Sequence, residues 1–291
     1  MPINTNLVNF KTPEVKNTIQ KEEVEKYLRA INSKNNYYLD NNVAPNIYSV
    51  AQEISILESI WKMPDLHGSI EEMEQNVLML VHGEQTMNFK RLLKFGETVE
   101  TYAKIQSIIQ KGANYILTLL AEHHDEDKNK ISDSTWTLFI RAAESDIKKE
   151  SNKLKNNQKK KNDKPKAEPE ILNSTGFDIN NDITKAYSKA SNDFNPIHLD
   201  EDTAKKAGLS GIIVHGLCTM AMTMEQIIDT NLNGNPSVLD SITLRFSSPV
   251  YPGDSLEVKT YKSENPNTIN FDVSNSSNIK VIKNGIIKTR S

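Results

Sequence analysis

Two side chains that can transfer protons stand close together in one short polar segment. Asp193 and His198 lie five positions apart, and Pro196 stiffens the turn between them. A proline disfavours helical geometry at the residue before it, so this turn can direct both side chains into one cavity. A carboxylate and an imidazole held together are suited to general acid and base chemistry. The segment therefore predicts a site that moves protons.

A backbone group suited to binding negative charge follows at the start of an apolar run. His215 and Gly216 precede residues 217–228, which are too long and too unbroken in hydrophobicity for an alternating strand. We expect a buried helix that begins near Gly216. Free N–H groups at a helix N-terminus can bind a developing oxyanion, and glycine allows the closest approach. We expect His215 to have a structural or supporting role.

The chain contains an internal duplication. A shift of 160 positions places residues 19–40 on residues 179–200 without a gap and with seven identities. A shift of 157 positions superimposes residues 89–100 on residues 246–257. The nearly constant offset indicates two copies of one structural unit.

The two copies differ at the residues that could transfer protons. Under the 160-residue shift, Asp193 falls on Ser33 and His198 falls on Tyr38, whereas Asn195 keeps its counterpart in Asn35. The first copy therefore lacks both groups of the pair. We expect it to contribute scaffold and substrate channel, which leaves one site per chain.

The elements that must position these residues follow the same plan in both copies. In the second copy, we expect helices at 182–191 and from 216 onward, then strands at 241–246, 255–261, 268–274 and 279–282 with turns at 252–254 and 283–285. In the first copy, we expect a central helix at 49–63 and strands at 85–90, 97–106, 114–123 and 132–142. Each helix followed by antiparallel strands predicts an α+β fold with two sheets, each wrapped around a helix.

A basic segment separates the copies. Residues 148–170 hold nine Lys against four acidic residues and one large apolar side chain, Leu154, so we expect a flexible linker. This gives an N-terminal domain at 1–147, the linker at 148–170 and a C-terminal domain at 171–291. The overall net charge is −3, so the rest of the chain carries −8 and is not expected to bind nucleic acid.

Composition limits the other function classes. Cys218 is the single cysteine, which excludes an intramolecular disulfide and a cysteine-based zinc site and fits a reducing compartment. No apolar run approaches the roughly 18 residues that a membrane helix needs. The N-terminus lacks the features of a secretion signal, so we expect a cytoplasmic protein that is not bound to a membrane. The sequence leaves open whether the chain forms a homodimer.

The polar segment and its surroundings resemble a known signature. Residues 187–200, followed by Ala204, Gly208, Gly211 and the turn at 214–216, are similar to the hydratase signature of the MaoC-like family. Asn192 stands where that family usually has glycine, and asparagine also tolerates left-handed backbone geometry. In the first half, residues 43–45 and 82–85 resemble the degenerate partner domain. The resemblance covers nearly all of the chain except the linker.

The resemblance implies a double hot-dog fold and an enzyme that acts on acyl thioesters. The expected reaction is (R)-specific hydration of a trans-2-enoyl-CoA, or the reverse dehydration. Its implied catalytic set is Asp193 and His198 to activate water, Asn195 to fix their orientation, and Gly216 to bind the thioester oxygen. The resemblance implies neither a cofactor nor a metal.

Several alternatives remain open at this point. The acyl carrier could be acyl carrier protein in place of coenzyme A, which would make the chain a dehydratase of fatty acid synthesis. A thioesterase and a non-catalytic protein that binds acyl thioesters are further alternatives, although a binding protein would be expected to lose the Asp193 and His198 pair. We interpret the apolar helix residues Cys218, Met220, Met222 and Met224 as packing, and the charged run at 123–127 as a solvated turn rather than a metal site.

Overall fold

The computed structural model describes residues 3–141 and 170–290. The first half contains η1 (Thr5–Leu7), β1 (Val15–Thr18), α1 (Lys21–Ala30), α2 (Tyr37–Asp40), η2 (Asn46–Ser49), α3 (Val50–Trp61), α4 (Pro64–His67), α5 (Ile70–Leu78), β2 (Leu80–Phe89), β3 (Thr98–Lys111), β4 (Asn114–His124) and β5 (Lys130–Ile140). The second half contains β6 (Ile171–Asp178), α7 (Ile183–Ser191), η3 (Pro196–His198), α8 (Glu201–Lys206), α9 (Gly216–Asn231), η4 (Pro236–Val238), β7 (Leu239–Phe246), β8 (Ser255–Tyr261), β9 (Thr268–Asn275) and β10 (Lys280–Thr289). The predicted linker lies outside the described residues except for Glu170.

The strands of both halves form one antiparallel sheet, in the order β1-β3-β4-β5-β2-β7-β10-β9-β8-β6. The two predicted sheets are therefore joined edge to edge where β2 pairs with β7. At this seam Thr86 lies opposite Thr243, and their hydroxyl oxygens are 3.1 Å apart. These two residues are equivalent under the 157-residue shift, so a local twofold axis passes through the seam.

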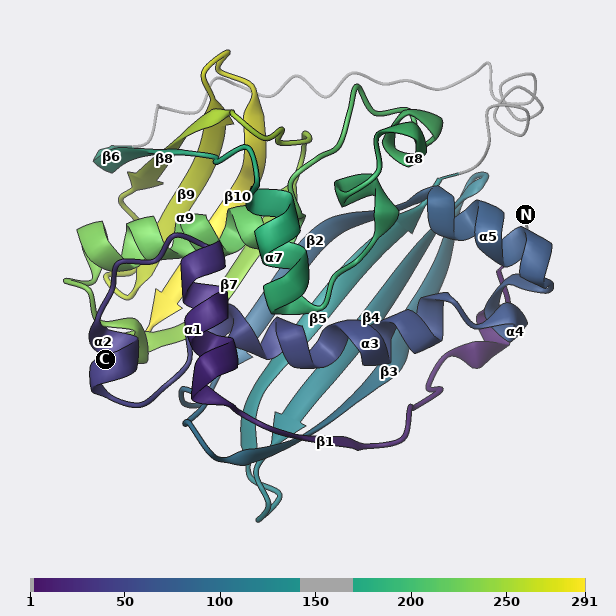
Figure 1. The fold of residues 1–291 in the computed structure, drawn as a ribbon, viewed down its shortest axis with the longest axis horizontal. Coiled ribbons are helices and arrows are strands. Elements are labelled where there is room, and N and C mark those ends of the chain that lie inside the picture. Colours follow the sequence, from purple (N-terminus) through teal and green to yellow (C-terminus); the bar gives the residue numbers. More distant parts are fainter. Residues whose placement is uncertain (1–2, 142–169, 291) are drawn as a thin grey trace.

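Helices α3 and α9 fill the inner face of the curved sheet, as Figure 1 shows, with α3 lying across the strands of the first half. Eleven side chains of α9 are buried, including its cysteine and methionines, because the helix is apolar on nearly every side. The strands alternate buried and half-buried residues in the period of two that a sheet with one covered face requires. No helix among the described residues is long and apolar enough to cross a membrane.

The backbone repeats the duplication in detail. The N–H of Ile19 donates to Glu97 at 2.9 Å, and the equivalent N–H of Ile179 donates to Asp254 at 2.8 Å. Helices α1 and α7 pack side by side (Figure 1), with the hydroxyls of the equivalent Tyr27 and Tyr187 3.3 Å apart in the core. The two copies thus meet along this helix pair and along the β2–β7 seam.

Several strand predictions need correction. The predicted turn at 283–285 lies inside β10, where the register to both neighbouring strands shifts. Asn284 has a φ of 55°, and a Cβ on Gly285 would lie 2.5 Å from the Phe271 ring, so this Asn-Gly pair forms a bulge instead of a turn. The edge strands β1 and β6 were not predicted, because both are largely exposed and lack a hydrophobic pattern.

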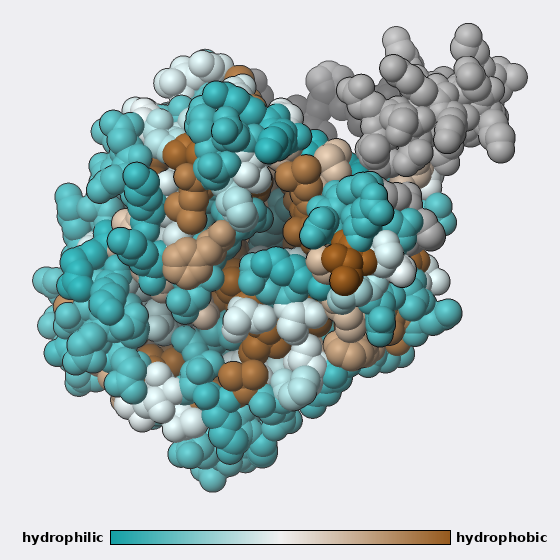
Figure 2. Space-filling model, turned by 45° about the vertical axis from the view of Figure 1, so that its right-hand side comes forward, coloured by the Kyte–Doolittle hydropathy of each residue, from teal (hydrophilic) through white to brown (hydrophobic). Residues whose placement is uncertain are grey.

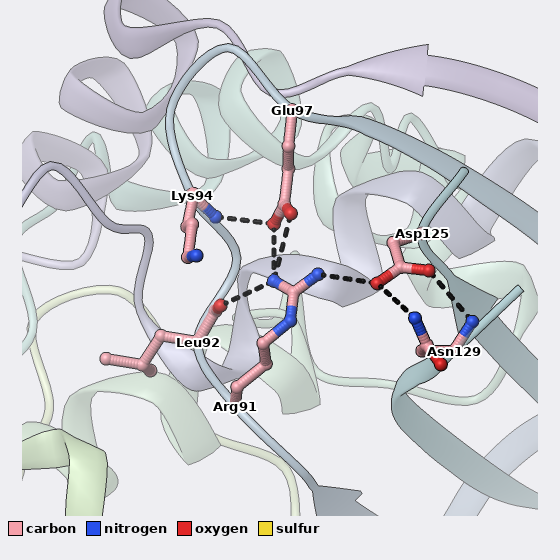
Figure 3. Close-up of polar contacts among 6 residues, drawn as sticks. All are labelled: Arg91, Leu92, Lys94, Glu97, Asp125 and Asn129. Carbon is pink, nitrogen blue, oxygen red and sulfur yellow. Dashed lines mark hydrogen bonds and ion pairs between the residues drawn. The ribbon is translucent and has the colours of Figure 1, made fainter. Parts of the chain in front are cut away.

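The charged turn between β4 and β5 is tied to the loop that follows β2. Arg91 donates to Glu97 at 2.9 Å and to Asp125 at 3.5 Å, while the Asp125 carboxylate accepts from the N–H of Asn129 at 2.8 Å (Figure 3). The Asp125 carboxylate therefore holds the two loops together through Arg91 and Asn129, while His123 points into the core toward Glu53. The residues of the charged run at 123–127 do not converge on one metal position.

A buried polar cluster fixes α3 to the sheet of the first half. The fully buried carboxylate of Glu53 accepts from Trp136 Nε1 at 2.6 Å and from the Ser134 hydroxyl, and it lies 3.2 Å from His123 Nε2. The other ring nitrogen of His123 contacts the Ser132 hydroxyl at 3.0 Å. One side chain of α3 thus accepts hydrogen bonds from two groups on β5 and lies beside the His123 ring on β4.

We expect Glu53→Leu to lower the free energy of unfolding by about 3–5 kcal/mol, because it leaves several buried polar groups without their acceptor. Urea unfolding followed by circular dichroism measures this change. Glu71→Ala, on the exposed face of α5, is the control and should change stability by less than about 0.5 kcal/mol. A loss below about 1 kcal/mol for Glu53→Leu would show that water replaces the lost contacts.

Candidate active site

The loop after α7 positions the Asp193 carboxylate. Helix α7 ends at Ser191, and the next residue, Asn192, has a left-handed φ of 62°, the geometry that asparagine tolerates and glycine would favour. Asp193 Oδ1 then accepts the N–H of Asn195 at 3.2 Å, and Asn195 Oδ1 accepts the N–H of Ile197 at 3.3 Å. Asn195 therefore acts as a positioning residue for the turn.

His198 ends the short helix η3 and is 7% exposed. Its Nδ1 lies 2.8 Å from the carbonyl oxygen of Ile213, an acceptor that requires the proton on Nδ1. Nε2 is then the unprotonated nitrogen of the neutral ring and can accept a proton. The chain thus sets the tautomer that a general base needs.

The two side chains face each other closely enough to share one water molecule. Ligand atoms of Asp193, His198 and His215 all lie within 4.8 Å of one another, and a water bonded to two groups spans up to roughly 5.6 Å. Burial raises the pKa of the Asp193 carboxyl, while His198 nearby opposes that shift. Burial lowers the pKa of His198, and Asp193 opposes it. These opposed shifts bring an acid and a base nearer to each other in proton affinity.

His215 supports both members of the pair. Its ring stacks on that of His198 with centroids 3.8 Å apart, and it is 1% exposed. Nε2 lies 3.1 Å from the backbone oxygen of Asp193 and 3.2 Å from the Ser188 hydroxyl. Burial holds its pKa well below the usual range, so the ring is neutral. Sequence reasoning placed His215 in a supporting role, and the His-Gly pair before a helix was the available signal.

Gly216 is the first residue of α9 and follows His215 directly. The first N–H donors within the helix are those of Cys218 and Thr219, which both bond the carbonyl of His215. The N–H of Gly216 precedes these bonds and is available to an oxyanion. A Cβ at this position would lie 3.2 Å from the Phe246 ring, so the site has room for glycine and little more.

The corresponding loop of the first half has the same turn and different chemistry. Asn35 Oδ1 again accepts an N–H two residues on, at 3.0 Å. Ser33 and Tyr38 both donate to the buried carboxylate of Glu225 on α9, at 2.5 and 2.6 Å. Where the second half carries an acid and base pair, the first half holds a structural contact between the two copies.

The comparisons with known proteins agree with this arrangement. Sequence models of the MaoC like domain and of the FAS1-like dehydratase domain region match residues 156–281 and 6–134. The probable enoyl-CoA hydratase 2 of Dictyostelium discoideum is 30% identical over 203 residues, which cover 69% of this chain and 67% of that protein. This chain belongs to the MaoC-like dehydratase family.

One longer relative and one solved structure show how much of each protein this MaoC-like chain matches. The peroxisomal multifunctional enzyme type 2 of Drosophila melanogaster is 27% identical over 63% of the chain, which spans only 30% of that longer protein. The crystal structure of the MaoC-like dehydratase from Phytophthora capsici superimposes with a TM-score of 0.77 at 20% identity, covering 100% of this chain and 98% of that one. The predicted double hot-dog fold is thus confirmed.

Asp193, His198 and His215 of this MaoC-like chain also form the one group among the described residues that could hold a metal ion. One ring nitrogen of each histidine is already hydrogen-bonded to a backbone oxygen, namely His198 Nδ1 and His215 Nε2, so neither of these nitrogens is free to bind a metal. The prediction that the reaction uses no metal remains a prediction.

Proposed function

We propose that this chain adds water reversibly to a trans-2-enoyl-CoA and forms the (3R)-3-hydroxyacyl-CoA. The observation that carries the proposal is the pairing of the half-buried Asp193 with the buried His198 beside the N-terminus of α9. The comparisons support the proposal through the 30% sequence identity with the probable enoyl-CoA hydratase 2. An acyl-CoA thioester is therefore the expected partner.

The geometry supports a reaction in which one water molecule supplies both the hydroxyl added to C3 and the hydrogen added to C2. His198 Nε2 accepts a proton from the water held against Asp193, and the water oxygen bonds to C3 of the substrate. The double-bond electrons move toward the thioester oxygen, where the Gly216 N–H stabilises the enolate. The proton then passes from the pair to C2, which leaves the site in its starting state. The reverse sequence dehydrates the hydroxyacyl thioester.

The test is incubation with trans-2-enoyl-CoA substrates of several chain lengths, with loss of the conjugated thioester followed by absorbance. We expect a single enantiomer, because Asp193 and His198 deliver water from one side of a fixed substrate, and the resemblance to the MaoC-like hydratase signature implies that it is the (3R) alcohol. Chiral chromatography identifies the product. Formation of the (3S) alcohol would contradict the stereochemical assignment, and release of free thiol without hydration would indicate a thioesterase.

A further inference from the structure

The central helices α3 and α9 are equivalent in the two copies, and their residues can be matched one by one. The N–H of Ala44 donates to Leu93 at 2.9 Å, and the N–H of Val214 donates to Val250 at 2.8 Å. Leu93 and Val250 are equivalent under the 157-residue shift, so Ala44 matches Val214, which is a shift of 170. The helix that follows has sixteen residues in both copies, four in η2 and twelve in α3 against sixteen in α9. The shift of 170 therefore holds along the whole helix.

This shift places Glu225 of α9 on Ser55 of α3. Glu225 is 7% exposed, and its carboxylate accepts from Ser33 and Tyr38, which stand where the second copy has its acid and base pair. The local twofold axis exchanges the two loops and also exchanges α9 with α3. Because Glu225 lies against the loop of the first copy, Ser55 lies opposite the acid and base pair of the second copy.

Electrostatic contacts between α3 and the catalytic loop agree with this placement. Ser55, Glu58 and Lys62 are spaced by three and four residues and share one face of the helix. Burial has the largest effect on the pKa of Asp193, and among the smaller effects Glu58 raises this pKa and Lys62 lowers it. Helix α3 also contacts α7, which leads into the catalytic loop. The face of α3 that carries Ser55 is thus turned toward Asp193.

The two equivalent faces differ in how far they are covered. On α9, Glu225 is 7% exposed and Ile228 is 1% exposed, whereas the matching Ser55 is exposed and the matching Glu58 is half-buried. The space in front of the first loop is therefore filled by the Glu225 carboxylate, and the matching space in the second copy is open. Figure 2 shows that the molecule is hollowed on one face, with hydrophobic side chains around the opening.

The substrate needs such a space beside the reacting water. Water held between Asp193 and His198 can attack C3 only if the enoyl group lies directly against it. A glutamate at the position of Ser55 would fill that place, as Glu225 does in the first copy, whereas the short serine side chain leaves it free.

We propose that α3 of the first copy forms the wall of the catalytic site opposite Asp193 and His198, and that Ser55 is the residue that admits the enoyl group. The inference rests on the proposed function and assigns it a specificity-determining residue. The first copy thus contributes directly to the site, although it has no acid and base pair of its own.

The first experiment varies the size of the side chain at this position and measures hydration of trans-2-decenoyl-CoA. We expect Ser55→Glu to lower kcat/KM by about 10²-fold or more, because the longer side chain displaces the substrate from the water. Ser55→Gln has the same size without the charge and should lose nearly as much. Ser55→Ala removes the hydroxyl without adding volume and should change the rate by less than about threefold.

A control for added charge is available on the other central helix. Thr230 is exposed and lies fourteen residues after Gly216, which is roughly 21 Å along α9. Thr230→Glu should therefore keep the wild-type kcat/KM. Circular dichroism confirms that each variant is folded.

The second experiment measures occupancy of the same place without turnover. The native Cys218 is fully buried, so the thiol introduced by Ser55→Cys is the one expected to react with a methanethiosulfonate reagent. Decanoyl-CoA at about ten times its Kd should slow this reaction about tenfold, because only the unbound protein exposes the thiol. The thiol introduced by Thr230→Cys is the control and should react at the same rate with and without decanoyl-CoA.

A folded Ser55→Glu protein with the wild-type kcat/KM would overturn the inference, and so would a loss in Ser55→Ala as large as that in Ser55→Glu. An equal reaction rate of the Ser55→Cys thiol with and without decanoyl-CoA would overturn it as well, and this test remains if Ser55→Glu does not fold. If the folded wild type hydrates no enoyl-CoA, the proposed function fails, whereas protection of the Ser55→Cys thiol still supports the position of the wall.

Discussion

Asp193→Asn and His198→Ala should each lower kcat for hydration by about 10²- to 10⁴-fold, because either change removes a partner in proton transfer. Asn at position 193 retains an oxygen that can accept the Asn195 N–H, so the turn should persist and the loss should report on chemistry. The double variant should be little slower than the slower single variant, since the pair acts as a unit. Steady-state rates on one enoyl-CoA, with circular dichroism to confirm folding, provide the measurement.

The first half of the chain supplies matched controls for this prediction. Ser33→Ala and Tyr38→Phe alter the equivalent loop positions, where each hydroxyl donates to Glu225. We expect a loss of stability from the unsatisfied carboxylate and only a modest change in turnover. A rate loss as large as that of Asp193→Asn, in a folded protein, would contradict a single catalytic centre per chain.

Local sequence signals were sufficient for the elements around the catalytic pair. The apolar run after Gly216 predicted α9, and Asn192 with Pro196 predicted the break between α7 and η3. Each signal depends on one residue type and its immediate neighbours, so it can be interpreted without knowing the rest of the fold. The duplication extended the same prediction to the first half.

Contacts between distant segments could not be predicted in this way. Glu225 lies on the apolar helix, and nothing nearby in the sequence indicates that Ser33 and Tyr38, nearly 200 positions earlier, bond its carboxylate. The joining of β2 to β7 likewise depends on how the two halves pack. Gly83 could have signalled the bulge in β2, but the register shift between His82 and Glu84 follows only once the pairing of β2 with β5 is known.

Gly216→Val should lower kcat/KM by about 10²-fold, because a branched side chain at the start of α9 displaces the Phe246 ring and shifts the N–H that we propose binds the thioester oxygen. Gly216→Ala should have a smaller effect, since its Cβ would meet the ring at 3.2 Å and require a movement of a few tenths of an ångström. Rates on one enoyl-CoA are compared across the series. Combining Gly216→Ala with Phe246→Leu distinguishes the two causes: partial recovery of activity indicates crowding against the ring. If the double variant is no faster than Gly216→Ala, the methyl group itself obstructs the thioester oxygen. A Gly216→Val protein with the wild-type rate would exclude this N–H as the group that stabilises the enolate.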